Sequence, residues 1–210
     1  MCIEKVTADI FYKTWIDFFN MNKACLLKAW NNSKQYTELT IGEKYSSKED
    51  SPFGNFFKNK FKGYEYRQED GLVDISFYKK ENYHNIFNLY EPKSPKFNSI
   101  TLDDYPIYYD ILIEHENEIT MCYEEMIKLT AFRSDLKVLI TYNWEEITSD
   151  NYKYVNETIV DNFKKIISQS NQRNSESREI EYLLIIGQLN KEQNNVNWYQ
   201  TSINGDFKIE

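Results

Sequence analysis

Acidic residues gather at the end of one apolar segment, where they could bind a metal ion. Residues 107–117 read Ile-Tyr-Tyr-Asp-Ile-Leu-Ile-Glu-His-Glu-Asn, an apolar strand that ends in two carboxylates one residue apart. Successive side chains of a strand point to opposite faces, so we expect Glu114 and Glu116 on one face and His115 on the other. Two like charges so close are unfavourable without a positive partner, and a divalent cation suits a pair of hard oxygen ligands.

The elements that would position these carboxylates follow from the spacing of apolar residues. Helical spacing predicts one long helix or two consecutive helices over 9–31, then helices over 118–133 and 151–168. The turn signal Asp70-Gly71 lies between two alternating runs and predicts a hairpin. The expected strands are 63–69, 72–79, 107–116, 136–142 and 181–187, with edge strands at 198–203 and 206–209. The polar segments 44–53 and 168–178 are predicted loops, while 35–42 is ambiguous.

This order of elements predicts the fold class. A hairpin followed by strands that alternate with helices indicates an α/β protein of three layers, with a central mixed β-sheet flanked by helices. The 210 residues, of which 41% are hydrophobic, suit a single domain over 1–210. Residues 81–105 contain two prolines and are expected to be an insertion or a long connection. In the helix 118–133 the candidate buried positions are Met121, Met126, Ile127, Leu129 and Phe132.

Composition narrows the setting in which the protein works. No run of apolar residues is long enough to span a bilayer, so no membrane partner is expected. Three scattered cysteines and a start without the order of a secretory signal favour a cytoplasmic protein. The net charge of -8 argues against a protein whose whole surface carries the positive charge that binds nucleic acid. Residues 51–96 nevertheless carry eight basic and six acidic residues, a local charge of +2.

The order of elements and acidic residues resembles the PD-(D/E)XK nuclease superfamily, whose fold many restriction endonucleases share. The matching residues are Asp74 on the second hairpin strand, then Glu114 and Glu116 at the end of the next strand. The resemblance covers roughly 9–187 in topology but only these residues in motif. Three features depart from the family pattern. Glu116 stands where the family usually has a lysine, no proline precedes Asp74, and the long spacing from Asp74 to Glu114 requires the insertion.

The resemblance implies a restriction-endonuclease-like fold and metal-assisted hydrolysis of phosphodiester bonds, in defence or DNA processing. Asp74 and Glu114 would hold Mg²⁺ or Mn²⁺, and Glu116 would act as general base or further metal ligand. Lys128, on the following helix, would reach the scissile phosphate or the attacking water. Nucleic acid, and DNA in the first place, is then the expected partner.

Each of these residues also has a structural interpretation. Asp74 could be an outward residue of an alternating strand, and Glu114 with Glu116 an exposed strand end. Lys128 could form an ordinary ion pair with Glu124 four residues earlier. His115, which falls on the opposite face, is expected to be a hydrogen-bonded core residue.

A second group of residues suggests contact with nucleic acid. Lysines and an arginine interleave with aromatic residues, so cations could neutralise phosphates while rings stack on bases. These candidates are Lys58, Lys60, Lys62 and Arg67. The alternative is an amphipathic element with its aromatic side chains in the core.

The acidic charge, the missing lysine and the absent proline motivate a second function. In it, the chain is a non-catalytic interaction protein on the same fold, with a protein partner. The chain has no Gly-rich phosphate loop, nucleophile elbow or paired His/Cys ligands, which weakens other enzyme classes.

Overall fold

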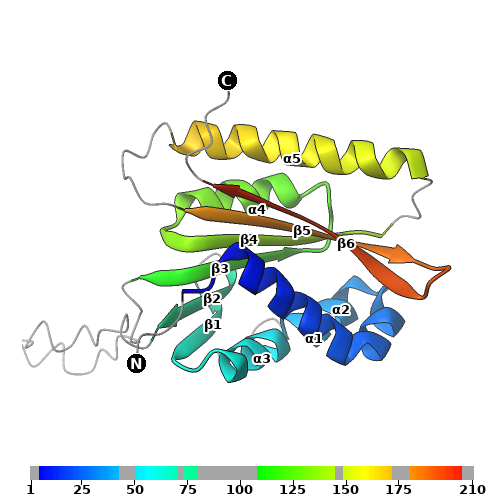
Figure 1. Cartoon of the computed structure of the whole chain (residues 1–210), viewed down its shortest axis with the longest axis horizontal. Helices are drawn as coiled ribbons and strands as arrows, with labels where there is room; N and C mark the ends of the chain where they lie inside the picture. Colours follow the sequence, from blue (N-terminus) through cyan, green and yellow to red (C-terminus); the bar gives the residue numbers. More distant parts are fainter. Residues whose placement is uncertain are drawn as a thin grey trace, which may run out of the picture.

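The structure is a computed structural model of the 210-residue chain, and it describes residues 5–42, 51–70, 73–79, 108–144, 149–171 and 180–204. Within these ranges the helices are α1 (Ala8–Ala29), α2 (Ser33–Thr40), α3 (Pro52–Lys60), α4 (Cys122–Ala131) and α5 (Ser149–Asn171). The strands are β1 (Tyr64–Asp70), β2 (Val73–Lys79), β3 (Tyr109–Glu116), β4 (Ser134–Asn143), β5 (Glu181–Asn190) and β6 (Asn195–Asn204). Figure 1 shows their arrangement.

The six described strands form one mixed sheet in which spatial order follows sequence order. The strands β1, β2 and β3 form an antiparallel meander, β3, β4 and β5 are parallel, and β6 returns antiparallel to β5. Parallel neighbours need a crossover connection, and α4 and α5 provide the two that are required (Figure 1). The predicted α/β class with a central mixed sheet is therefore confirmed.

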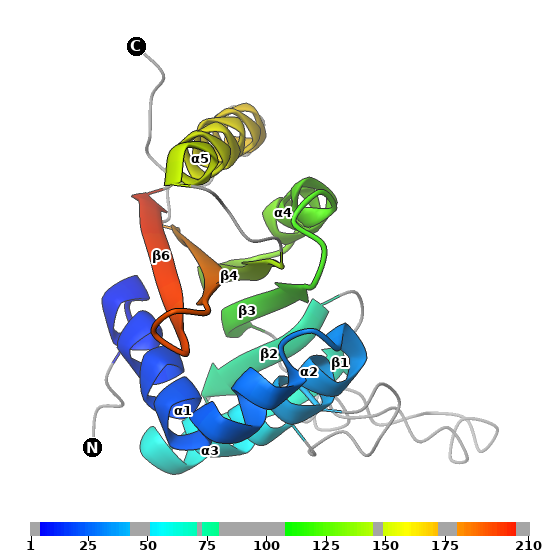
Figure 2. The same ribbon diagram turned by 90° about the vertical axis from the view of Figure 1, so that its right-hand side faces the viewer.

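Helices cover both faces of the sheet. The helices α1, α2 and α3 lie on one face, and α4 and α5 lie on the other (Figure 2). We call the first the aromatic face and the second the crossover face. The aromatic face buries a large cluster that includes Trp15, Trp30, Tyr36, Phe53, Phe57 and Tyr142. The crossover face buries a smaller and mostly aliphatic cluster that includes Leu112, Met126, Leu129, Leu139 and Phe163.

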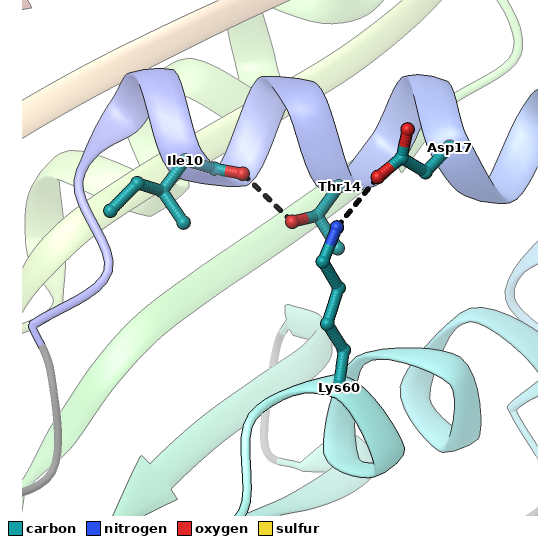
Figure 3. Close-up of polar contacts among 4 residues, drawn as sticks. All are labelled: Ile10, Thr14, Asp17 and Lys60. Carbon is teal, nitrogen blue, oxygen red and sulfur yellow. Dashed lines mark hydrogen bonds and ion pairs between the residues drawn. The ribbon is translucent and has the colours of Figure 1, made fainter.

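Helix α1 begins with a side-chain cap and packs by its apolar stripe. The Thr7 hydroxyl accepts the Ile10 amide at 3.4 Å, which satisfies one of the amides that a helix start leaves open. One turn later Thr14 donates its hydroxyl to the Ile10 carbonyl at 2.8 Å. The Lys60 ammonium lies 2.6 Å from an Asp17 carboxylate oxygen and so ties the end of α3 to α1 (Figure 3).

In the first third of the chain one expectation needs correction, and one segment that was left ambiguous is now assigned. The predicted loop over 44–53 is wrong at its end, because α3 already begins at Pro52 with Ser51 as its cap. Ser51 accepts the Gly54 amide at 3.0 Å, and proline is favourable in a first helical turn. The ambiguous segment 35–42 is largely helix α2, which Asn32 caps through the Gln35 amide.

Helix α4 buries a narrower stripe than expected. Met126 and Leu129 are buried as predicted, but Met121 and Ile127 are 40% and 56% exposed, so those two predictions are wrong. Ile127 lies about 100° around the helix from Met126, outside the face that packs on the sheet. The predicted insertion 81–105 and the strand 206–209 lie outside the described residues. Within the described ranges, no helix combines the length and apolar character needed to cross a bilayer.

Candidate functional site

The two carboxylates predicted to share a site are neighbours on adjacent strands. The antiparallel ladder of β2 and β3 ends at the pair Ile75 and Ile113, and Asp74 and Glu114 are the next residues of the two strands beyond that pair. Residues opposite one another in a ladder project from the same face. That face is the crossover face, where α4 packs, and Glu114 is only 2% exposed there.

Lys128 reaches the same place from above the sheet. Its ammonium lies 3.0 Å from Glu114 Oε1, and it also forms an ion pair with Glu125 one turn earlier on α4. The Lys128 side chain is 36% exposed, so this ammonium sits between the buried carboxylate and solvent. The predicted ion pair of Lys128 with Glu124 did not include Glu125, whose i,i+3 spacing on the helix also allows an ion pair.

We call the cluster of Asp74, Glu114, Glu125 and Lys128 the acidic site. Two of its groups, Glu114 and Lys128, have raised pKa values and so hold their protons tightly. Burial, followed by the charges of Asp74 and Glu125, raises the pKa of Glu114 well above its usual value, although Lys128 opposes this. Partial burial disfavours the charged form of Lys128 and would by itself lower its pKa. Its bonds to Glu125 and Glu114 outweigh that effect and raise its pKa. Both shifts favour the protonated form, so the site carries less negative charge than its carboxylates suggest.

Glu116 lies beside the acidic site and closes the turn after β3. It pairs with Thr141 of β4, and its carboxylate accepts the Glu118 amide at 2.7 Å. Burial is the largest cause that raises the pKa of Glu116. The neighbouring thiol of Cys122 has its pKa raised to about 12 by burial and by the charge of Glu116. Glu116 is thus on the predicted face, but its hydrogen bond goes to the following turn.

His115 points to the aromatic face, as the alternation of the strand predicts. Its Nε2 lies 2.6 Å from the Tyr142 hydroxyl and 3.3 Å from the Thr40 hydroxyl. The ring is nearly parallel to that of Tyr36, with centroids 6.2 Å apart. Burial lowers the pKa of His115 to about 3, so the imidazole is neutral at physiological pH. Its interpretation as a hydrogen-bonded core residue fits these contacts.

The basic residues considered for nucleic-acid binding extend from the last turn of α3 to the middle of β1. These residues are Lys58, Lys60, Lys62 and Arg67. The three lysines are near the start of β1, which pairs with the end of β2, whereas Asp74 lies at the beginning of β2. Lys58 forms an ion pair with Glu65, and Lys60 with Asp17. Arg67 pairs with Ser76, two residues from Asp74 on the same face, and so is nearer to the acidic site.

The acidic site contains carboxylates, which are the donor type that a hard divalent cation prefers. In the part of the chain that the structure describes, no group of three or more His, Cys, Asp or Glu side chains is placed to hold a metal. Mg²⁺ commonly takes only one or two protein carboxylates and keeps several waters. Asp74 and Glu114 supply such a pair of carboxylates on adjacent strands. Two protein ligands, completed by water, is therefore the coordination that these residues could offer.

Comparison of the chain with protein-family models, with curated proteins and with solved structures found no match. The function proposed below is therefore supported by the geometry of the acidic site and by the motif resemblance.

Proposed function

We propose that this protein is a metal-dependent nuclease with a restriction-endonuclease-like fold that hydrolyses phosphodiester bonds in nucleic acid. One observation carries the proposal: Asp74 and Glu114 follow the last pair of the β2–β3 ladder and are close enough to interact electrostatically, and the Lys128 ammonium lies 3.0 Å from Glu114. Two carboxylates and a lysine on one face are the groups that the motif requires. The order α1, β1–β2 hairpin, β3, α4, β4 also supports the resemblance.

Asp74 and Glu114 would hold Mg²⁺ or Mn²⁺ through their carboxylate oxygens. When bound, the ion would lower the pKa of a coordinated water and neutralise charge on the phosphate. Glu116 would accept a proton from the attacking water, and its raised pKa brings its proton affinity nearer to neutral pH. Asp74 is held in place because one of its carboxylate oxygens accepts the His115 amide at 2.8 Å.

Lys128 offers a substitute for the lysine that position 116 lacks. Its ammonium comes from α4 and still reaches Glu114 beneath it. Lysine binds phosphate as a point charge with three donors, so an ammonium between a carboxylate and solvent suits contact with a phosphate oxygen. The partial exposure of this side chain leaves it accessible from the solvent side.

The test uses the full chain with Mn²⁺ or Mg²⁺ and labelled single- and double-stranded DNA and RNA. We expect cleavage by the wild type and at least a hundredfold loss in Asp74→Asn and Glu114→Gln, because each replaces a carboxyl group that would coordinate the metal by an amide. Glu38→Gln is the matched control, since Glu38 forms an ion pair with Lys34 on α2, away from the acidic site. Cleavage that survives both site variants, or that Glu38→Gln also abolishes, would overturn the proposal.

One observation favours the second candidate, a non-catalytic interaction protein. Lys128 already neutralises Glu114, and the described residues contain no convergent group of three metal ligands. In this case the acidic site is a structural ion pair. Titration calorimetry with Mn²⁺ separates the two functions, because the interaction protein predicts no saturable binding and no change on Asp74→Asn.

A further inference from the structure

His115 connects the acidic site to the opposite face of the sheet. The ladder of β2 and β3 contains Ile75 with Ile113, Ser76 with Leu112 and Phe77 with Ile111. Beyond it the His115 amide donates to Asp74 Oδ2 at 2.8 Å, so a carboxylate takes the place of a strand carbonyl. The position of the Asp74 carboxylate therefore depends on where the backbone of His115 lies.

The imidazole of His115 is fixed from two sides. Thr40 of α2 donates its hydroxyl to the Tyr36 carbonyl at 2.9 Å, and its oxygen lies 3.3 Å from His115 Nε2. On the other side, Nε2 lies 2.6 Å from the Tyr142 oxygen. Because Thr40 donates its proton to Tyr36, a neutral imidazole that is protonated at Nε2 can donate to both hydroxyl oxygens. Tyr142 is fully buried and its ring packs against Trp30 and Trp144.

The same elements also hold the chain just after β3. The Asn117 side-chain amide donates to the Thr37 hydroxyl at 2.7 Å, and the Trp144 indole donates to the Asn117 carbonyl. These contacts come from α2 and from the residue that follows β4, and α2 and β4 also provide the partners of His115. The carboxyl end of β3 is thus fixed from the aromatic face, while its carboxylates point to the crossover face.

We propose that His115 is a positioning residue of the acidic site. Its ring, fixed by Tyr142 and Thr40, holds the backbone amide that orients the Asp74 carboxylate next to Glu114. His115 itself touches neither metal nor substrate. As a statement about metal binding and cleavage, this inference rests on the proposed function. As a statement about the Asp74 carboxylate, it can be tested independently of that function.

The test uses Tyr142→Phe, which keeps the ring but removes the hydroxyl that contacts Nε2. Tyr182→Phe is the matched control, because Tyr182 is also buried and its hydroxyl contacts Lys137, away from His115. Two quantities are measured: the hydrogen-exchange rate of the His115 amide by NMR, and the affinity for Mn²⁺ by calorimetry. In Tyr142→Phe we expect about tenfold faster exchange of this amide, relative to the Ile113 amide, and about tenfold weaker Mn²⁺ binding.

Tyr182→Phe should leave both quantities unchanged even if it lowers overall stability. If Tyr142→Phe does not fold, Thr40→Val removes the other contact to Nε2 and should shift both quantities in the same direction by a smaller factor. The inference is overturned if exchange at His115 rises no more than at Ile113, or if the control gives the same change. Absence of Mn²⁺ binding by the wild type would refute the proposed function alone, since the exchange rates would still decide the role of His115.

Discussion

The two faces of β3 handle polar groups in opposite ways. On the aromatic face His115 is buried, neutral and hydrogen-bonded by hydroxyl groups of α2 and β4. On the crossover face Glu114 is equally buried but lies among charges, with the ammonium of Lys128 as its partner. Consecutive residues of a single strand thus occupy a neutral, rigid environment and a charged one that borders on solvent.

This difference indicates that the crossover face can change its protonation state, whereas the aromatic face supports the strand mechanically. Burying a charge costs far more than burying a neutral group that keeps its hydrogen bonds. The aromatic face avoids that cost and packs ring against ring around Trp15, Tyr36 and Tyr142. The acidic site bears part of the cost, so gaining or losing a proton there changes the stability of the fold.

The largest loss of stability should come from removing a large buried side chain from the aromatic face. Trp15 is fully buried against Phe18, Phe53 and Trp198, so Trp15→Ala should lower the free energy of unfolding by about 3–5 kcal/mol. Met21, on the same helix, is 74% exposed, and Met21→Ala should change stability by less than about 0.5 kcal/mol. Urea denaturation measures both. Equal losses in the two variants would show that α1 does not pack as described.

A buried lysine under the crossover helices should give the next largest effect. Burial lowers the pKa of Lys137 from 10.5 to about 8, and the side chain lies against Tyr182. Between these values the unfolded chain keeps a proton that the folded chain has released, so stability should rise with pH, by about 3 kcal/mol in total.

Lys137→Met should remove that rise and be more stable than the wild type below pH 8. Unfolding free energies measured from pH 7 to 10.5 test this. Lys164→Met, which alters an exposed ion pair on α5, serves as control and should retain the rise. A rise that persists in Lys137→Met would show that this ammonium is hydrated in the folded protein.

The buried carboxyl group of Glu114 should lower the free energy of unfolding at neutral and higher pH. Its raised pKa means that the folded chain binds a proton more tightly than the unfolded chain, so stability falls as pH rises above the usual value of 4.5. Glu114→Gln should therefore stabilise the fold at pH 8, by about 1–2 kcal/mol. The gain should be smaller in Glu116→Gln. A loss of stability in Glu114→Gln would instead mean that its ion pair with Lys128 outweighs its burial.

Local patterns in the sequence predicted much of this fold. The alternation in 107–116 and the helical spacing in 9–31 gave β3 and α1 nearly to their ends, since each buries a regular face. The short helices α2 and α3 were missed or left ambiguous because they contain few turns and depend on packing under the sheet. Met121 and Ile127 were misplaced because spacing alone does not reveal how wide a stripe the sheet covers.

The candidate site was predictable only in part. Alternation placed Glu114 and His115 on opposite faces, because strand geometry determines this. Asp74 was expected near Glu114 only from the resemblance to the nuclease superfamily. The contacts of His115 with Tyr142 and Thr40 join residues 27 and 75 positions away, which no local pattern encodes. The ion pair of Lys128 with Glu114 likewise depends on how α4 crosses the sheet.

The smallest predicted effect distinguishes a working site from a structural ion pair. The Lys128 ammonium and a metal ion would compete for the same negative charge, so Lys128→Met should bind Mn²⁺ about tenfold more tightly. It should nevertheless lose cleavage, because the phosphate contact is gone. Calorimetry and the cleavage assay measure the two effects, with Lys164→Met as the control for lost positive charge. Weaker Mn²⁺ binding in Lys128→Met would mean that this lysine holds the carboxylates in place, and the acidic site would then resemble the aromatic face in being a structural support.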